Sequence, residues 1–133
     1  MTTFDGLVAS MPFAQALGMQ VSSASPGEVS GELPWAPERC TTGGAMHGGA
    51  LMAFADSLGA ICAFLNLPPG AATTTIESKT NFFRGLSAGE VKGVCRPLHV
   101  GRRFIVVQTD LADGQGRRVA QVTQTQAVLA ATG

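Results

Sequence analysis

One acidic residue stands alone in a long apolar stretch, and its position makes it the best candidate for chemistry in this chain. Between Arg39 and Glu77 the only formally charged side chain is Asp56, which lies in the apolar run of residues 50–65. A carboxylate removed from water costs on the order of several kcal/mol unless it is paired, hydrogen-bonded or protonated. Asp56 therefore either acts as a general base or nucleophile, or lies where it reaches solvent.

The segment His47-Gly48-Gly49 comes just before this apolar run and predicts the start of a helix. The first N–H groups of a helix have no partner within the helix, and glycine lets a ligand oxygen approach them closely. Such donors can polarise a carbonyl group. The alternative interpretation is that the glycines only permit close packing and that His47 is an ordinary loop or core histidine.

The spacing of Gly48 and Asp56 limits how they can act together. They are eight residues apart in the sequence, which is about 12 Å along one helix at 1.5 Å per residue. One carbonyl group cannot contact both. If both act on one reacting centre, they come from two subunits whose helices lie antiparallel across a two-fold axis. The chemistry thus predicts a homodimer with two equivalent sites.

The composition excludes several classes of protein. The chain has 133 residues, zero formal net charge and 14% charged residues, so we expect a single domain over residues 1–133 with no nucleic-acid partner. The three cysteines are too few and too far apart for a disulfide framework or a CxxC motif, which favours a cytoplasmic location. The N-terminus lacks the pattern of a signal peptide. We expect no metal, because His47, His99 and Asp56 lack the spacing of metal ligands.

Periodicity and turn residues predict an α+β fold. Residues 1–17 suggest short helices, residues 19–24 and 28–35 a hairpin, and residues 48–65 one helix. That helix is apolar nearly all round, so it should be enclosed as a core helix; its central Asp56 argues against a membrane span. Strands are expected over residues 72–84, 89–100, 103–112 and 117–129, joined by short glycine-containing connections that favour an antiparallel meander. We therefore expect a long antiparallel sheet of five to six strands around one central helix.

Several motifs together carry a family resemblance. They are His47-Gly48-Gly49, Ala55-Asp56 nine positions after the histidine, residues 75–85, Gly101-Arg102 and the strand at residues 120–128. In this combination the chain resembles the hotdog-fold acyl-CoA thioesterases of the phenylacetate-degradation (PaaI) type, over roughly residues 10–129. The resemblance implies a hotdog fold and hydrolysis of an acyl-CoA thioester without a cofactor. It also implies sites at the interface of a homodimer, which can pair further into a homotetramer.

The resemblance also assigns roles to individual residues. Asp56 matches the catalytic carboxylate, and Gly48 matches the backbone donor to the thioester carbonyl. His47 matches the histidine that holds the loop, and Thr75 matches a hydroxyl that orients the water or the carboxylate. For CoA, the expected contacts are Gly49, Arg84 and Arg102, since guanidinium groups pair well with phosphate.

One position departs from the family pattern. Where close relatives often have Asn or Gln, six residues before the histidine, this chain has Thr41, whose hydroxyl is the candidate replacement. Thr41 keeps open one alternative to a thioesterase, a non-catalytic domain that binds acyl-CoA. A hotdog enoyl-CoA hydratase or dehydratase, which also works on acyl thioesters, is a second alternative. The depth of the acyl pocket is expected to depend on Leu51, Phe54 and Leu58.

Overall fold

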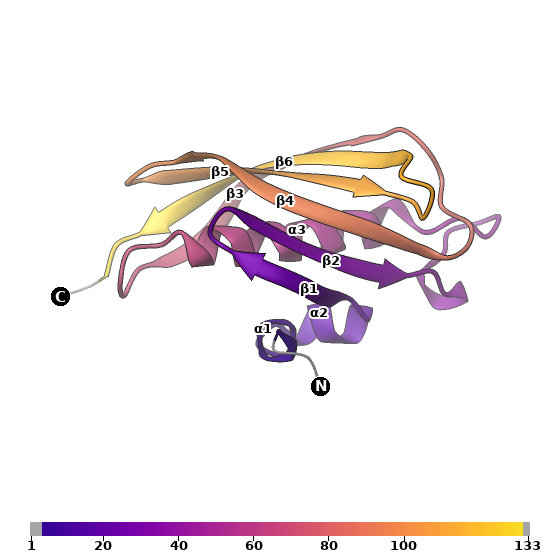
Figure 1. The fold of residues 1–133 in the computed structure, drawn as a ribbon, viewed down its shortest axis with the longest axis horizontal. Helices are drawn as coiled ribbons and strands as arrows, with labels where there is room; N and C mark the ends of the chain where they lie inside the picture. Colours follow the sequence, from indigo (N-terminus) through magenta and orange to yellow (C-terminus); the bar gives the residue numbers. More distant parts are fainter. Residues whose placement is uncertain (1–3, 132–133) are drawn as a thin grey trace.

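The computed structural model describes residues 4–131 as six strands curved around one long helix (Figure 1). The predicted α+β class, with a long antiparallel sheet around a central helix, is confirmed, and the architecture is the hotdog fold. The elements are α1 (Asp5–Ala9), α2 (Pro12–Leu17), β1 (Gln20–Ser25), β2 (Glu28–Pro34), the 3-10 helix η1 (Pro37–Arg39), α3 (Gly48–Leu65), β3 (Ala72–Phe82), β4 (Glu90–Val100), β5 (Phe104–Ala112) and β6 (Arg118–Leu129).

The order of strands in the sheet differs from the expected meander. Strands β4, β5 and β6 are consecutive antiparallel neighbours as predicted, but β3 pairs with β6, giving the order β1-β2-β4-β5-β6-β3. The connection at residues 83–89 is long enough to carry the chain back across the sheet. It is tied to the segment before α3, because the Met46 N–H donates to the Leu86 carbonyl (2.8 Å). As a result, β3 forms one edge of the sheet.

Helix α3 packs its apolar face against the concave side of the sheet. Leu51, Phe54 and Leu58 are buried there against the sheet, and their expected influence on the depth of an acyl pocket stays a prediction. The backbone of β4 comes very close at Gly93, where an added Cβ would lie 2.5 Å from the Leu58 side chain. By length and composition α3 could cross a membrane, but half of it is buried in the fold, as a core helix is.

Two cysteines that are distant in the sequence meet in this core. Cys62 on α3 and Cys95 on β4 are both free and fully buried. A hydrogen bond between the two thiols, together with burial, raises the pKa of the Cys95 thiol above its usual range. Cys95 therefore stays a neutral thiol that packs as a small apolar group.

The turn between β5 and β6 is held by a buried carboxylate. Asp113 accepts hydrogen bonds from the backbone N–H groups of Gln115 and Arg117, both at 2.9 Å, and from the Arg117 guanidinium at 2.8 Å. These donors lower the pKa of Asp113 below its ordinary value of 3.8. The carboxylate thus stabilises the fold fully at pH values above its ordinary pKa of 3.8. This stabilisation is lost as the pH falls through the lowered pKa of the folded state.

We expect Asp113→Asn to lower stability at neutral pH, because the amide loses its charge-assisted contact with Arg117. The variant should also lose less stability than the parent when the pH is lowered from 5 to 2. Urea unfolding across that range measures both effects. If the free energies of unfolding of parent and variant differed by the same amount at every pH, this role of Asp113 would be contradicted.

Candidate active site

Asp56 lies on the side of α3 that faces the β3 edge of the sheet, and two side chains from the sheet hold it. Gln124 on β6 donates from Nε2 to Asp56 Oδ1 at 2.6 Å, and the Thr75 hydroxyl on β3 donates to the same oxygen at 3.3 Å. The structure therefore brings Thr75 to Asp56, as the resemblance implied. Both bonds end on Oδ1, and no residue from 4 to 131 bonds to Oδ2, which is therefore available to a ligand.

Of the two possibilities that the sequence left open for Asp56, the single chain shows a carboxylate that reaches solvent. Asp56 is exposed, and so is most of β3 beside it. The physical reason is the strand order: within residues 4–131 no element lies beyond β3 to cover this side of the helix. The apolar run around Asp56 is explained by the other faces of α3, which are buried under the sheet.

The sequence interpretation missed two glutamines that complete this hydrogen-bond network. Gln124 and Gln126 are almost fully buried on the concave face of β6, on the same side as Val122. Gln126 donates from Nε2 to the Thr75 hydroxyl at 2.9 Å. The sequence did contain a sign of these two glutamines. Side chains two apart in a strand share one face, and polar residues on the buried face of a strand are unusual.

The turn before α3 is a capped helix start. His47 is the N-cap residue, and its Nδ1 accepts a hydrogen bond from the Gly49 N–H at 2.7 Å. Gly49, expected to bind CoA, thus has its N–H engaged by His47. The Gly48 N–H has no acceptor among the residues that the structure describes, so it remains available for a carbonyl oxygen.

The cap leads to a prediction about stability. His47→Ala should lower the free energy of unfolding by about 1 kcal/mol, the usual effect of losing an N-cap side chain. His47→Asn is the matched variant, since Asn is a preferred N-cap residue and should retain most of the stability. Urea unfolding measures both, and equal stabilities of the Ala variant and the parent would contradict the capping role.

Residues of the preceding loop fix the position of this turn. The Arg39 guanidinium donates to the carbonyls of Leu17 and Pro34, and the Arg39 carbonyl accepts the His47 N–H at 2.8 Å. Trp35 Nε1 donates to the Gly44 carbonyl at 3.0 Å. Thr41 lies in the exposed tight turn of this loop, where its N–H donates to the Ala45 carbonyl at 2.8 Å.

Gly48 and Asp56 do not come together within one chain. Helix α3 runs without interruption from Gly48 to Leu65, so the eight-residue spacing is a true helical separation of about 12 Å. Met52 lies midway, and residues four apart share a face of a helix, so Gly48, Met52 and Asp56 form one row. Met52 is 38% exposed, which is unusual for a large apolar residue on the main core helix.

The two arginines expected to bind CoA lie far apart. Arg84 follows β3, next to the start of α3, and its N–H donates to the Val119 carbonyl. Arg102 lies in the turn between β4 and β5, where it lines a hollow with Pro68, near the end of α3. Both side chains are exposed. They are separated by roughly the length of β4, about 33 Å at 3.3 Å per residue.

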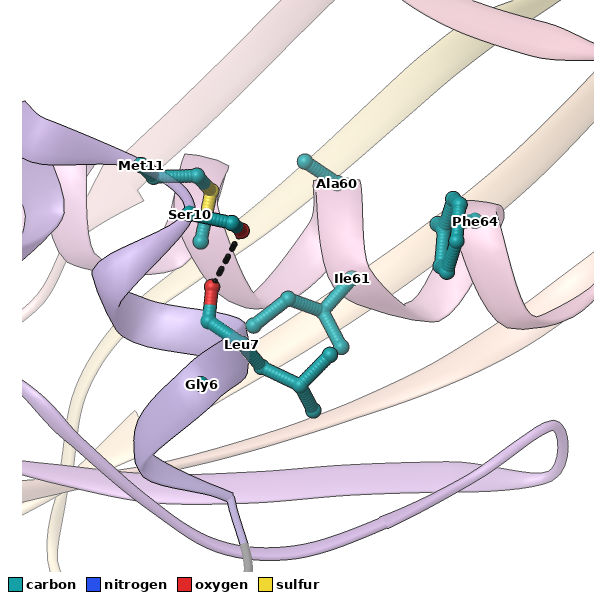
Figure 2. Close-up of a pocket in the computed structure, with 7 residues that line it drawn as sticks. All are labelled: Gly6, Leu7, Ser10, Met11, Ala60, Ile61 and Phe64. Carbon is teal, nitrogen blue, oxygen red and sulfur yellow. Dashed lines mark hydrogen bonds between the residues drawn. The ribbon is translucent and has the colours of Figure 1, made fainter.

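An apolar pocket lies between α1 and the second half of α3 (Figure 2). Its volume is about 330 Å³, and it is lined by Gly6, Leu7, Ser10, Met11, Ala60, Ile61 and Phe64. In Figure 2 the side chains of Leu7 and Ile61 approach each other from the two helices, and the Ser10 hydroxyl donates to the Leu7 carbonyl (2.8 Å). Ala60 is one helical turn beyond Asp56, so the two residues are about 6 Å apart along the axis of α3.

Comparison with known proteins gives consistent matches. A family model described as the thioesterase superfamily matches residues 43–120. The chain is 36% identical over 86 residues to the proofreading thioesterase EntH of Cronobacter sakazakii, a match that spans 65% of this chain and 63% of the relative. It is 32% identical over 113 residues to EntH of Klebsiella pneumoniae, covering 85% of this chain and 82% of that protein. A 1,4-dihydroxy-2-naphthoyl-CoA hydrolase of Escherichia coli is 35% identical over 86 residues.

Solved structures with the same fold are also similar in sequence. A putative esterase from Mycobacterium tuberculosis superimposes with a TM-score of 0.89 at 29% identity, over 92% of this chain and all of the other. A mutant thioesterase from Pseudomonas aeruginosa gives a TM-score of 0.90 at 26% identity, over 97% of this chain and 95% of the other. The fold thus extends well beyond the segment that the family model matches.

Proposed function

Because the chain belongs to the thioesterase superfamily, we propose that it is an acyl-CoA thioesterase that releases CoA and a carboxylic acid. The observation that carries this proposal is the geometry of Asp56. One carboxylate oxygen is held by Gln124 and Thr75, and the other, on an exposed side of the helix, has no hydrogen-bond partner in the described part of the chain. A carboxylate oriented in this way is suited to act on water or on a carbonyl carbon.

In the general-base route, Asp56 Oδ2 takes a proton from water while the water oxygen bonds to the thioester carbonyl carbon. The carbonyl oxygen becomes negatively charged and is stabilised by the Gly48 N–H of a second copy, as in an oxyanion hole. The carbon–sulfur bond then breaks, and the CoA thiolate takes up the proton. In the nucleophilic route, Asp56 forms a mixed anhydride that water hydrolyses, with the same products. Neither route needs a cofactor.

The proposed site requires a homodimer. If Asp56 of one copy faces Gly48 of another, the two-fold axis passes near Met52, midway between them on the row that they form. The exposed Met52, and the exposed Ile76 and Phe82 on β3, would then be covered at the interface. A dimer of dimers remains a prediction. The free cysteines would remain reduced in the cytoplasm, where we expect the reaction to occur.

The antiparallel arrangement also explains how Arg84 and Arg102, which lie far apart in one chain, can both bind one CoA. It places the start of α3 from one copy at the same end of the dimer as the end of α3 from the other. Arg84 of one copy and Arg102 of the other would then flank one CoA, whose phosphates suit guanidinium groups.

The apolar pocket beside α1 is proposed to hold the acyl group. Its volume of about 330 Å³ is at the small end of typical ligand pockets. It therefore suits the acyl part of a substrate rather than all of CoA. Its lining from Leu7, Ile61 and Phe64 favours an aryl or medium-chain acyl group over a charged one. The relative named as a naphthoyl-CoA hydrolase supports an aryl group.

The proposal is tested by incubating the protein with a panel of acetyl-, octanoyl-, palmitoyl- and benzoyl-CoA and measuring the release of free thiol. Binding is measured in parallel by calorimetry. We expect thiol release that is fastest with benzoyl- or octanoyl-CoA. Tight binding without thiol release would identify a non-catalytic acyl-CoA binding domain. Hydration of an enoyl-CoA without release of thiol, followed by NMR, would identify a hydratase.

A further inference from the structure

We propose that Gln124 is a positioning residue that holds the Asp56 carboxylate in its reactive orientation, and that Gly59 provides the space in which it does so. This inference rests on the proposed function, since it explains how the same site holds its carboxylate. Neither residue contacts a thioester in the proposed mechanism. Both act through Asp56, which connects β6 to the middle of α3 by a hydrogen bond of 2.6 Å.

Gln124 has an unfavourable position for stability alone. It is fully buried on the face of β6 that packs against α3. Its Oε1 has no hydrogen-bond partner among the residues that the structure describes. A buried polar atom without a partner costs about 1–3 kcal/mol, and the neighbouring inward position of the same strand holds Val122. What the amide contributes here is its bond to Asp56.

The orientation of the amide follows from the charge of its partner. An ionised carboxylate can only accept hydrogen bonds, so the NH₂ end of Gln124 faces Asp56. The oxygen end then points at the backbone of α3 at Gly59. A Cβ at Gly59 would lie only 1.8 Å from Gln124 Oε1 and 2.8 Å from its Cδ. Any larger residue at position 59 would displace the amide.

Gly59 is itself unfavourable in a helix. Glycine within a helix costs about 1 kcal/mol relative to alanine, and Gly59 lies in the interior of α3. Two residues that each lower stability thus lie in contact, on two different elements. The need for a hydrogen-bond donor beside Asp56 explains why both Gln124 and Gly59 are present.

The second donor to Asp56 is oriented in a similar way. The Thr73 hydroxyl shares its one hydrogen between Gln126 Oε1 at 3.3 Å and the Ala127 carbonyl at 2.9 Å. The NH₂ end of Gln126 therefore faces the Thr75 hydroxyl, whose own proton is directed to Asp56. Both donors meet at Oδ1, so they fix which oxygen of Asp56 is free to react.

The central test is Gln124→Leu, which keeps the approximate size and removes the donor. We expect kcat for thioester hydrolysis to fall by up to about 100-fold, the usual effect of a misplaced reacting group, with KM within about twofold. The melting temperature should stay equal or rise, since the unpartnered oxygen is removed. The matched control is Gln121→Leu on the same strand, where Gln121 contacts Asp110 instead; its kcat should be unchanged.

Three further measurements separate positioning from other roles. In an Asp56→Asn background, Gln124→Leu should cause no further loss of rate, because Gln124 acts only through Asp56. A crystal structure of Gln124→Leu should place the Asp56 carboxylate in a different rotamer or in more than one. Gly59→Ala should reproduce the loss of kcat although alanine favours the helix.

Several outcomes would overturn the inference. These are a normal kcat in Gln124→Leu, an equal loss of rate in the Asp56→Asn background, or an unchanged Asp56 rotamer in the variant crystal. If the parent protein hydrolyses no thioester, the proposed function fails, and the crystal structure of the variant still decides whether Gln124 positions Asp56.

Discussion

Asp56→Asn should lower kcat for acyl-CoA hydrolysis by about 100- to 10,000-fold, the range expected when a general base is removed. Asparagine has nearly the same shape, and its carbonyl oxygen can still accept the hydrogen bonds from Gln124 and Thr75. The fold and the affinity for acyl-CoA should therefore change little. Initial rates of thiol release, with circular dichroism and calorimetric binding on the same sample, measure these effects.

The control for this variant is Asp110→Asn. Asp110 lies on β5, where it accepts a hydrogen bond from Gln121 and is paired with Arg118 at 3.6 Å, away from Asp56. Its substitution also removes one carboxylate but should leave kcat unchanged. A near-normal rate in Asp56→Asn would exclude Asp56 as base and as nucleophile, and with it the proposed mechanism.

Met52→Glu should convert the protein to monomers and lower kcat by about 100- to 1,000-fold, the usual effect of losing an oxyanion donor. If the two-fold axis passes near Met52, the substitution places two carboxylates against each other. The separated chains retain Asp56 but lack the Gly48 N–H of the second copy. Analytical ultracentrifugation and thiol release, measured at the same protein concentration, test both effects.

Met52→Leu is the matched variant, because it keeps an apolar side chain of similar size at the same place. It should remain a dimer with nearly normal activity. A Met52→Glu protein that stays dimeric and fully active would show that the two-fold axis does not pass near this residue. The arrangement of Asp56 opposite Gly48 would then be wrong, even if the protein hydrolyses thioesters.

Local structure was predictable from the sequence, because periodicity and turn residues determine it. Helix α3 begins and ends where expected, and the four predicted strands after it correspond to β3 through β6. The pairing of β3 with β6 was not predictable in this way. It depends on where the connection at residues 83–89 crosses the sheet, and that path is set by contacts with the segment before α3.

The site was predictable only in part, for a similar reason. Asp56 is conspicuous because it interrupts an apolar run, and the glycines before α3 are typical of a helix start. Gln126 reaches Thr75 because β3 pairs with β6, so the error in strand order concealed this contact. Gln124 reaches Asp56 because β6 packs against α3, a contact that the sequence did not predict. Whether Asp56 reaches solvent stayed open, because an apolar neighbourhood in sequence says little about one side of a helix.

The two walls of the apolar pocket come from separate parts of the chain. One wall belongs to α3, which also carries Asp56, and the other belongs to the short helical segment around α1. Substitutions at Leu7 or Met11 can therefore reshape the pocket while leaving the carboxylate and its donors in place. If this pocket holds the acyl group as proposed, the choice of acyl group and the chemistry of hydrolysis are separable traits in evolution. A new substrate range would then need changes only in the wall formed by α1 and the residues that follow it.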